Sequence, residues 1–172
     1  ADNKEGKAII GISGGKDSTI AAALCVEALG ADRVIGVMMP QDVQRDIDDS
    51  RKVCELLGIT AYEIDIGPAC AALYRSIDEA YDFDHTVTNI PAITTNTPSR
   101  IRMATLYAIA AAIGGRVCNT GNASEAFVGY TTKYGDLAGD YAVLRDYYVT
   151  EVYKIGDALN LPEYLVHKDP SD

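Results

Sequence analysis

The sequence has no tryptophan, only two histidines, and no Cys-x-x-Cys pair. Its four cysteines are Cys25, Cys54, Cys70 and Cys118. The spacings typical of zinc sites and redox motifs are therefore missing, and we expect the cysteines to be small buried side chains in a reducing compartment. His85 and His167 stand far apart without a ligand-like neighbour, so we expect both to be exposed structural residues.

Basic residues are also scarce. Fifteen lysines and arginines stand against 25 acidic residues, which gives a net charge of −10. Because a long nucleic-acid footprint needs clustered cations, this balance argues against a nucleic-acid partner, although a small anionic substrate needs only a few. The sequence shows no signal peptide and no apolar run of about eighteen residues, so we expect a cytoplasmic protein without a membrane contact. The 172 residues suffice for one domain with a real core.

The most informative stretch runs from Lys7 to Leu29. An apolar run, Ala8 to Ile12, leads into the hexapeptide Ser-Gly-Gly-Lys-Asp-Ser at Ser13 to Ser18, and an alanine-rich helical pattern follows. The pattern predicts a buried strand, a glycine turn and a helix N-terminus. Unpaired backbone N–H groups and the positive end of the helix dipole favour phosphate at such a place.

The residue types in this turn narrow the choice of ligand. The turn is neither a Walker A loop nor a G-x-G-x-x-G dinucleotide fingerprint. Ser13, Ser18 and the N–H groups between them could hold a pyrophosphate, and Asp17 could hold its Mg²⁺. The alternative is a plain strand-to-helix turn in which Asp17 only complements the helix dipole.

The rest of the chain alternates between strand and helix patterns. Further strands are expected at Arg33–Met39, Thr60–Ile66 and Arg116–Asn119. Helices are expected at Asp46–Leu57, Gly67–Tyr81, Thr97–Ile113, Val149–Leu159 and Glu163–Lys168, with a short one near Ala123–Val128. Thr97 would be the N-cap and Pro98 the first residue of its helix, after a fifteen-residue loop from Asp82 to Asn96. This order predicts an α/β fold, a Rossmann-like parallel sheet of four or five strands with helices on both faces.

A second carboxylate follows the Arg116–Asn119 strand, in the segment Thr120 to Glu125. Asn122 could cap the next helix with Glu125 three residues later, an approximate capping box. Alternatively, Glu125 lies at the same sheet edge as Asp17 and binds Mg²⁺ with it, because the carboxyl ends of parallel strands meet at one edge. The spacing alone leaves both interpretations open.

Two other features allow more than one interpretation. Arg100 and Arg102 fall in the first turn of the predicted Thr97–Ile113 helix, where cations oppose the helix dipole. They could bind an anion or pair with acidic residues such as Asp82 and Asp84. The polar, aromatic segment from Tyr130 to Asp136 could be a surface loop or part of a site.

The hexapeptide resembles the signature of the ATP pyrophosphatases, the PP-loop superfamily with an adenine nucleotide alpha hydrolase-like fold. Four segments together resemble blocks of bacterial NAD⁺ synthetases of the ammonia-dependent type: SGGKDS from Ser13, PSRIRMATLYAIA from Pro98, NTGNASE from Asn119 and GYTTKYGDLAGD from Gly129. The match covers almost the whole chain.

The resemblance implies a two-step ligase reaction. ATP activates the nicotinate carboxylate of deamido-NAD⁺ as an acyl-adenylate, releasing pyrophosphate, and ammonia then displaces AMP to give NAD⁺. The residues that would bind ATP are Gly11, Ile12, Ser13, Gly14, Gly15, Lys16, Asp17, Ser18, Thr120 and Ser171. Arg100, Lys133 and Asp140 would bind deamido-NAD⁺, Asp17 and Glu125 would bind Mg²⁺, and Asp17 and Lys133 would be the catalytic residues.

The chain departs from this family at several points. Val149 stands where the family has a lysine that reaches the ATP phosphates, so phosphate binding would rely on Lys16, Lys168, a residue outside this chain or the metal. Family members are usually longer at both ends, so we expect one domain over 1–172 that lacks terminal segments. They are also homodimers, and without a glutaminase segment the expected nitrogen donor is ammonia.

Two other functions fit parts of the pattern. One is a different adenylating enzyme with the same loop, such as a GMP synthetase, and the other is an adenine-nucleotide-binding module without catalysis. The first predicts pyrophosphate release with xanthosine monophosphate, and the second predicts ATP binding without turnover.

Overall fold

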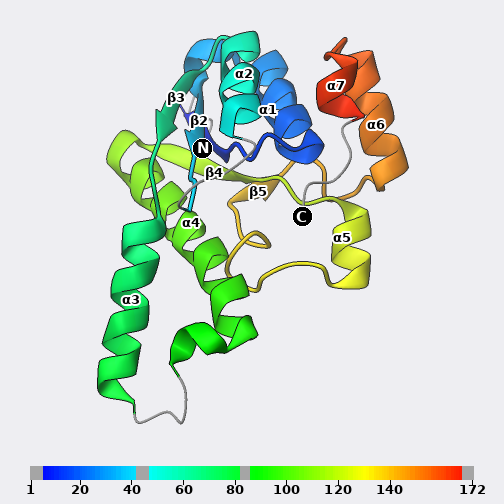
Figure 1. Cartoon of the computed structure of the whole chain (residues 1–172). Coiled ribbons are helices and arrows are strands. Elements are labelled where there is room, and N and C mark those ends of the chain that lie inside the picture. The colour runs from blue at the N-terminus through cyan, green and yellow to red at the C-terminus, as the bar shows by residue number, and fades with distance from the viewer. Residues whose placement is uncertain (1–5, 42–46, 82–85, 168–172) are drawn as a thin grey trace.

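The computed structural model describes residues 6–41, 47–81 and 86–167. Its centre is a parallel sheet of five strands in the order β3-β2-β1-β4-β5 (Figure 1). The strands are β1 Lys7–Gly11, β2 Val34–Met38, β3 Thr60–Glu63, β4 Gly115–Asn119 and β5 Tyr141–Ala142. The α-helices are α1 Lys16–Leu29, α2 Ile47–Leu57, α3 Gly67–Ala80, α4 Pro91–Ile113, α5 Ala123–Val128, α6 Val149–Ala158 and α7 Glu163–Val166. Two short 3₁₀ turns, η1 Ala31–Arg33 and η2 Val87–Asn89, complete the described elements.

The helices cover both faces of the sheet, as predicted. In one hydrophobic cluster, Ile10 of β1 lies with residues of α1, α2, α6 and α7, and in the other Ile9 lies with residues of α3 and α4 (Figure 1). Ile9 and Ile10 are neighbours whose side chains leave opposite faces of the strand, and both are fully buried. A continuous apolar strand therefore reflects a sheet that is buried on both sides.

The beginning of α4 corrects the prediction. The helix starts at Pro91, so Thr97 is not its N-cap, and η2 and the first turns of α4 occupy most of the expected loop. Residues 82–85 lie outside the described residues. The polar side chains that suggested a loop bond to backbone carbonyls inside the helix instead, since Asn96 Nδ2 donates to the Ala92 carbonyl at 2.8 Å. Pro98 is buried within the helix, although proline usually marks a helix start.

The shift of α4 also removes the helix-dipole argument for the arginines. Arg100 and Arg102 lie in the interior of α4 and not in its first turn. The other differences are smaller: β3 ends at Glu63, earlier than predicted, β4 begins at Gly115, and the two-residue β5 had not been predicted as a separate strand. β5 is held by Cys118 and Asn119 of β4, which pair with Tyr141 and Ala142.

The expected burial of the cysteines and the expected exposure of His167 are confirmed. All four cysteines are free and buried. His167 is exposed, its ring stacks on Tyr153 with centroids 5.1 Å apart, and its Nε2 lies 2.9 Å from Asp157 Oδ1. His85 lies outside the described residues. None of the helices in the described ranges is long and apolar enough to cross a membrane.

Candidate active site

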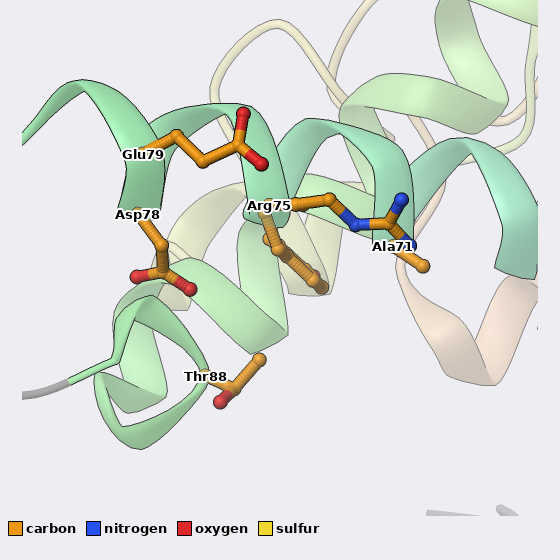
Figure 2. Close-up of a pocket in the computed structure, with 6 residues that line it drawn as sticks. Ala71, Arg75, Asp78, Glu79 and Thr88 are labelled. Atoms are coloured by element: carbon orange, nitrogen blue, oxygen red, sulfur yellow. The ribbon is translucent and has the colours of Figure 1, made fainter.

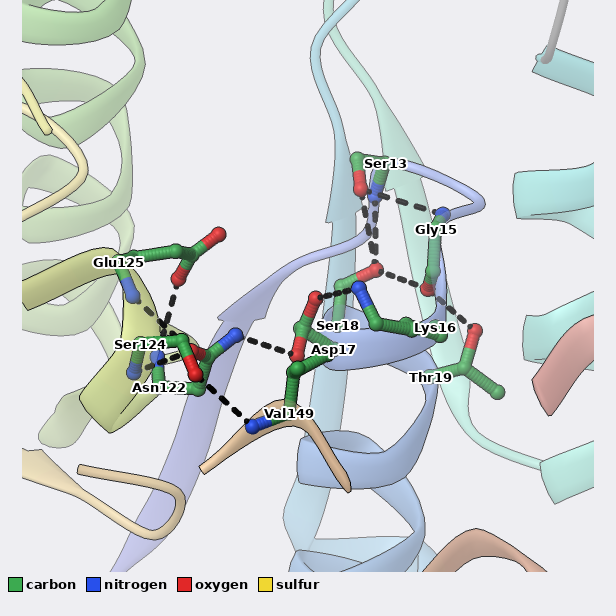
Figure 3. Close-up of polar contacts among 10 residues, drawn as sticks. All are labelled: Ser13, Gly15, Lys16, Asp17, Ser18, Thr19, Asn122, Ser124, Glu125 and Val149. Carbon is green, nitrogen blue, oxygen red and sulfur yellow. Dashed lines mark hydrogen bonds and ion pairs between the residues drawn. The ribbon is translucent and has the colours of Figure 1, made fainter. Parts of the chain in front are cut away.

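The glycine turn lies where the sequence predicts it, between β1 and α1. Gly14 has a φ of +79°, a left-handed conformation that favours glycine. Around it, Ser18 Oγ donates to the Gly15 carbonyl at 3.0 Å, and the Gly15 N–H donates to Ser13 Oγ at 3.3 Å (Figure 3). Thr19 Oγ1 also donates to the Gly15 carbonyl, at 2.8 Å. Hydroxyl and N–H groups therefore converge at a helix N-terminus, as a phosphate-binding turn requires.

This turn opens onto a cavity of about 360 Å³ at the carboxyl ends of the strands. The cavity is lined by the segments that follow β1, β4 and β5 and by the segment between α5 and β5. Ser13, Gly15, Asp17 and Ser18 come from the first segment, and Thr120 comes from the second. The cavity lies between β1 and β4, where the order in which the strands are added to the sheet reverses. This switch point is the usual ligand position in open α/β sheets.

Asp17 and Glu125 are brought together by Asn122. Asp17 Oδ1 accepts a hydrogen bond from Asn122 Nδ2 at 3.0 Å, and Asn122 Oδ1 accepts from the N–H groups of Ser124 and Glu125 (Figure 3). Glu125 Oε2 accepts from the Asn122 N–H at 3.0 Å and completes a capping box at the start of α5. The hydrogen bonds of Asn122 thus cap α5 and also bring the two carboxylates together.

The electrostatics of this pair suit a divalent cation. Partial burial raises the pKa of Glu125 above its ordinary value, and the charge of Asp17 adds to the rise. Among the described residues no group of three or more histidine, cysteine or acidic side chains could hold a metal alone. Mg²⁺ commonly takes one or two carboxylates and completes its shell with phosphate oxygens and water. Asp17 and Glu125 fit that requirement.

The raised pKa of Glu125 gives a testable pH dependence. Its carboxyl group binds a proton more tightly in the folded than in the unfolded protein, so folding stability falls as the pH rises from about 4 toward 7. Glu125→Gln keeps a capping-box side chain but cannot ionise. In metal-free buffer, urea unfolding of the wild type and this variant is expected to show the wild type losing stability relative to Glu125→Gln over that range.

The chain offers a matched control for this comparison. Glu151 forms the second capping box, in which its Oε2 accepts from the Tyr148 N–H at 2.9 Å at the exposed start of α6. Glu151→Gln therefore reports what the loss of a capping carboxylate does by itself. A difference between wild type and Glu125→Gln that stays constant from pH 4 to 7 would contradict the electrostatic assignment.

Lys16 is engaged within the turn itself. Its ammonium Nζ lies 2.9 Å from Asp17 Oδ2 and 5.8 Å from the centre of the Tyr153 ring. Lys16 belongs to the loop but does not line the cavity. Its charge is therefore partly balanced by Asp17 before any ligand enters. Lys168 and Ser171, the other sequence-predicted phosphate contacts near the C-terminal end, lie outside the described residues.

A second group of residues forms the opposite rim of the cavity. Asn119 is its centre: Nδ2 donates to the carbonyls of Asp136 and Ala138 at 2.6 and 2.8 Å, and Oδ1 accepts from the Gly121 N–H at 2.8 Å. At Gly139 the chain passes so close that an added Cβ would lie 2.7 Å from the Asn119 Cβ. These contacts fix the 136–140 segment against β4.

The predicted deamido-NAD⁺ residues are distributed around this rim. Asp140 lines the cavity, and its Oδ2 accepts from the Val117 N–H at 2.7 Å. Arg100 Nε donates to the Lys133 carbonyl at 3.1 Å, so these two residues lie together, but neither lines the cavity. The Lys133 ammonium instead lies over the Tyr134 ring, 4.9 Å from its centre. The Tyr130–Asp136 segment therefore lies at the cavity, which Thr131 and Asp136 line.

Arg102 has a structural partner. Its Nε donates to the Met39 carbonyl at 3.0 Å, and burial lowers the pKa of the guanidinium. This contact joins α4 to the end of β2. Arg100 and Arg102 therefore each donate a hydrogen bond to a backbone carbonyl, an option that the sequence did not suggest.

Several residues at the cavity were not identified from the sequence as ligand contacts. They include Asn119, Asn122, Asp136, Arg145 and Asp146. Asn122 had been recognised as a cap but not as a partner of Asp17. For Arg145 and Asp146, which follow β5, no sequence pattern pointed to the site, because the two-residue strand that carries them there is too short to show a period.

A second cavity, of about 450 Å³, lies away from the glycine turn (Figure 2). Its lining comes from one helix and one short turn, α3 and η2, and its charged residues are Arg75, Asp78 and Glu79. Asp78 is already used, because its Oδ1 accepts from the Val87 N–H at 2.8 Å. The α3 residues that line it, Ala71 to Glu79, come after the first turn of that helix, whereas the cavity at the glycine turn lies at a helix N-terminus and is the better candidate for chemistry.

The sheet order and the glycine turn at its switch point define a Rossmann-like α/β protein with a phosphate-type loop. Within that class the chain belongs to the NAD synthase family, because the model of that family matches residues 1–172. The family expected from the sequence is confirmed, whereas the expected resemblance to its bacterial members in particular is not, since the curated relatives are mostly archaeal.

The relatives agree with this family. The NH(3)-dependent NAD(+) synthetase of Pyrococcus furiosus is 39% identical over 170 residues, which are 99% of this chain and 63% of that protein. The protein of the same name from Methanoregula boonei is 36% identical over 165 residues, 95% of this chain and 63% of its own length. The chain thus spans somewhat less than two thirds of the length of these curated relatives.

Solved structures show the same fold. A structure of NMN synthetase from Francisella tularensis has a TM-score of 0.84 and 34% identity, and the match covers 96% of this chain and 66% of that one. NH3-dependent NAD synthetase from Campylobacter jejuni, in complex with the nitrate ion, has a TM-score of 0.83 and 30% identity, with 97% of this chain and 69% of that one covered.

Proposed function

We propose that the protein converts deamido-NAD⁺ to NAD⁺, using ATP and ammonia and releasing AMP and pyrophosphate. The observation that carries the proposal is the single cavity in which the Ser13–Ser18 turn, Asp17 and Glu125 meet, in a chain of the NAD synthase family. An ammonia-dependent ligase is also what the names of the curated relatives describe.

The geometry supports the first step of this reaction. A carboxylate oxygen of the substrate forms a bond to the α-phosphorus, and the bond from that phosphorus to the bridging oxygen of the β-phosphate breaks, so pyrophosphate departs. The N–H and hydroxyl groups of Ser13 to Ser18 would hold the β- and γ-phosphates, with Thr120 beside them. Mg²⁺ bound by Asp17 and Glu125 would neutralise the charge that develops on the leaving group. Positioning and charge stabilisation suffice, and no protein nucleophile is needed.

In the second step ammonia attacks the carbonyl carbon of the acyl-adenylate, AMP leaves with the electrons of the broken carbon–oxygen bond, and one proton passes from the nitrogen to solvent. We propose that Arg100, Lys133 and Asp140 hold deamido-NAD⁺ for this step. The contact between Arg100 and Lys133, and the position of Asp140 at the rim, are consistent with such a role. Lys133 would reach the substrate by leaving the Tyr134 ring. Gly11, Ile12 and Ser171 complete the proposed ATP contacts, of which Ser171 lies outside the described residues.

Arg100→Ala tests the deamido-NAD⁺ assignment. A lost charge-assisted hydrogen bond is worth about 1.5–3 kcal/mol, so the apparent KM for deamido-NAD⁺ is expected to rise about tenfold or more. The apparent KM for ATP is expected to change much less, because Arg100 does not line the cavity at the glycine turn. Initial rates measured against each substrate separate the two. Arg116→Ala is a matched control, since Arg116 is exposed on β4. Equal changes in both KM values would assign Arg100 to the stability of α4.

The reaction itself is tested by its stoichiometry. With deamido-NAD⁺, ATP, Mg²⁺ and ammonium, one NAD⁺, one AMP and one pyrophosphate are expected per turnover. Nicotinate mononucleotide is the alternative acceptor to test, because one structural relative is an NMN synthetase. Xanthosine monophosphate tests the GMP synthetase-like alternative. ATP binding without product from any of the three acceptors would favour a binding module and contradict the proposal.

We further propose a homodimer of single-domain subunits that uses free ammonia and functions in the cytoplasm. Four free, buried cysteines are consistent with a reducing compartment. Size-exclusion chromatography with light scattering tests the dimer. Replacing ammonium with glutamine tests the nitrogen donor, and glutamine is expected to give no NAD⁺.

A further inference from the structure

The lining of the cavity at the glycine turn is mostly acidic, which disfavours the binding of an anionic ligand. Five carboxylates line it, and Arg145 is the one basic residue among its described lining residues. The five are Asp17, Glu125, Asp136, Asp140 and Asp146. A triphosphate that enters this cavity meets a surplus of negative charge, and Mg²⁺ offsets only part of it. Lys16 is already paired with Asp17.

Arg145 is held in place by its backbone while its side chain stays available. Its neighbour Leu144 is fully buried, and the Tyr147 N–H donates to the Leu144 carbonyl at 3.0 Å, which closes a turn around Arg145. The Tyr147 carbonyl then accepts from the Ala123 N–H at 2.9 Å and ties this turn to the start of α5. Within the described ranges, the exposed Arg145 guanidinium has no ion-pair partner.

The first turn of the neighbouring helix α6 contains no basic residue. Val149 begins α6, and its N–H donates to Ser124 Oγ at 3.0 Å, so position 149 lies beside the start of α5 (Figure 3). A valine there contributes no charge. Arg145 lies four residues earlier in the chain, in a turn that the same start of α5 anchors. Its planar guanidinium can donate two parallel hydrogen bonds to a phosphate, which a lysine cannot do.

We propose that Arg145 binds the polyphosphate of ATP. The assignment rests on the proposed function for the identity of the nucleotide. It makes the loop after β5 a third part of the phosphate site, together with the Ser13–Ser18 turn and the α5 start. A phosphate of deamido-NAD⁺ has the same chemistry, so the two sources must be distinguished by experiment.

Titration calorimetry with Mg²⁺ and a non-hydrolysable ATP analogue tests the assignment without turnover. Arg145→Ala is expected to raise the Kd of the analogue about tenfold or more, and Arg145→Lys is expected to recover part of that loss. Arg75→Ala, at the other cavity, is the matched control and should bind like the wild type. The Kd of deamido-NAD⁺ should stay within about twofold in every variant.

A second substitution distinguishes the loss of the Arg145 charge from a change in the shape of the turn that carries it. In the Arg145→Ala background, Val149→Lys returns a cation to the same edge of the cavity and is expected to restore part of the affinity for the analogue. Unchanged binding of the analogue by Arg145→Ala would overturn the proposal, as would a loss confined to deamido-NAD⁺. A loss that neither lysine variant reduces would also overturn it, because it would reflect the shape of the turn.

These outcomes are independent of the amidation reaction. If the wild type binds the analogue through Arg145 but forms no NAD⁺, the proposed function fails and the Arg145 assignment stands. If the wild type forms NAD⁺ and Arg145→Ala binds the analogue as the wild type does, only the Arg145 assignment fails.

Discussion

Replacing Asp17 with asparagine is expected to lower kcat for NAD⁺ formation by roughly 10²- to 10³-fold, the usual cost of removing one preorganised electrostatic contact. The substitution removes the charge that would hold Mg²⁺ and keeps an oxygen that can accept the hydrogen bond from Asn122. The fold is therefore expected to survive. Steady-state rates at saturating ATP and deamido-NAD⁺, with circular dichroism as the check on folding, measure the effect.

Asp48→Asn is the control for this substitution. Asp48 is an exposed aspartate at the start of α2 that pairs with Arg51 and does not line the cavity at the glycine turn. It tests whether the loss of any aspartate charge affects catalysis. Full activity of Asp17→Asn would show that Mg²⁺ and pyrophosphate are held elsewhere, and it would contradict the proposed mechanism.

Asn119→Ala is expected to have the largest effect on stability. The nearly buried side chain makes three hydrogen bonds, and its removal leaves the carbonyls of Asp136 and Ala138 without their donor. At about 1 kcal/mol per lost bond, with a further cost for each orphaned group, the free energy of unfolding should fall by about 2–4 kcal/mol. Urea denaturation measures this change, which is a large part of the ~5–15 kcal/mol that stabilises a typical domain.

The same variant links stability to the site. Asn119 holds the 136–140 segment, which carries Asp140, so NAD⁺ formation should fall even at temperatures where the variant is folded. Asn89→Ala, at an exposed position in η2, is the comparison and should stay within about 0.5 kcal/mol of the wild type. A similar stability for Asn119→Ala and Asn89→Ala would show that the rim does not depend on these hydrogen bonds.

The parts of the fold that depend on local pattern could be predicted from the sequence. The apolar run before Ser13 predicted β1, because a strand buried on both faces needs no polar alternation. Asn122 and Glu125 predicted α5 with its cap, because a capping box is set by a fixed spacing. The Ser13–Ser18 turn could be placed for the same reason, since a glycine turn between a strand and a helix is a local signal.

The parts that depend on tertiary contact could not be predicted. The start of α4 was missed because its polar residues are typical of a loop and Pro98 is typical of a helix start, whereas packing against η2 and the sheet keeps the segment helical. The hydrogen bond from Asn122 to Asp17 joins residues 105 positions apart and has no sequence signature. Arg145 reaches the cavity only through a two-residue strand that pairs with β4.

The central claim is that the Ser13–Ser18 turn binds the triphosphate of ATP so that Asp17 and Glu125 share its metal. Crystals grown with Mg²⁺ and a non-hydrolysable ATP analogue test it most directly. Electron density for the β- and γ-phosphates is expected beside Ser13, Gly15 and Ser18, with the metal between the two carboxylates. Phosphate density at the cavity between α3 and η2, or anywhere else away from this turn, would contradict the claim.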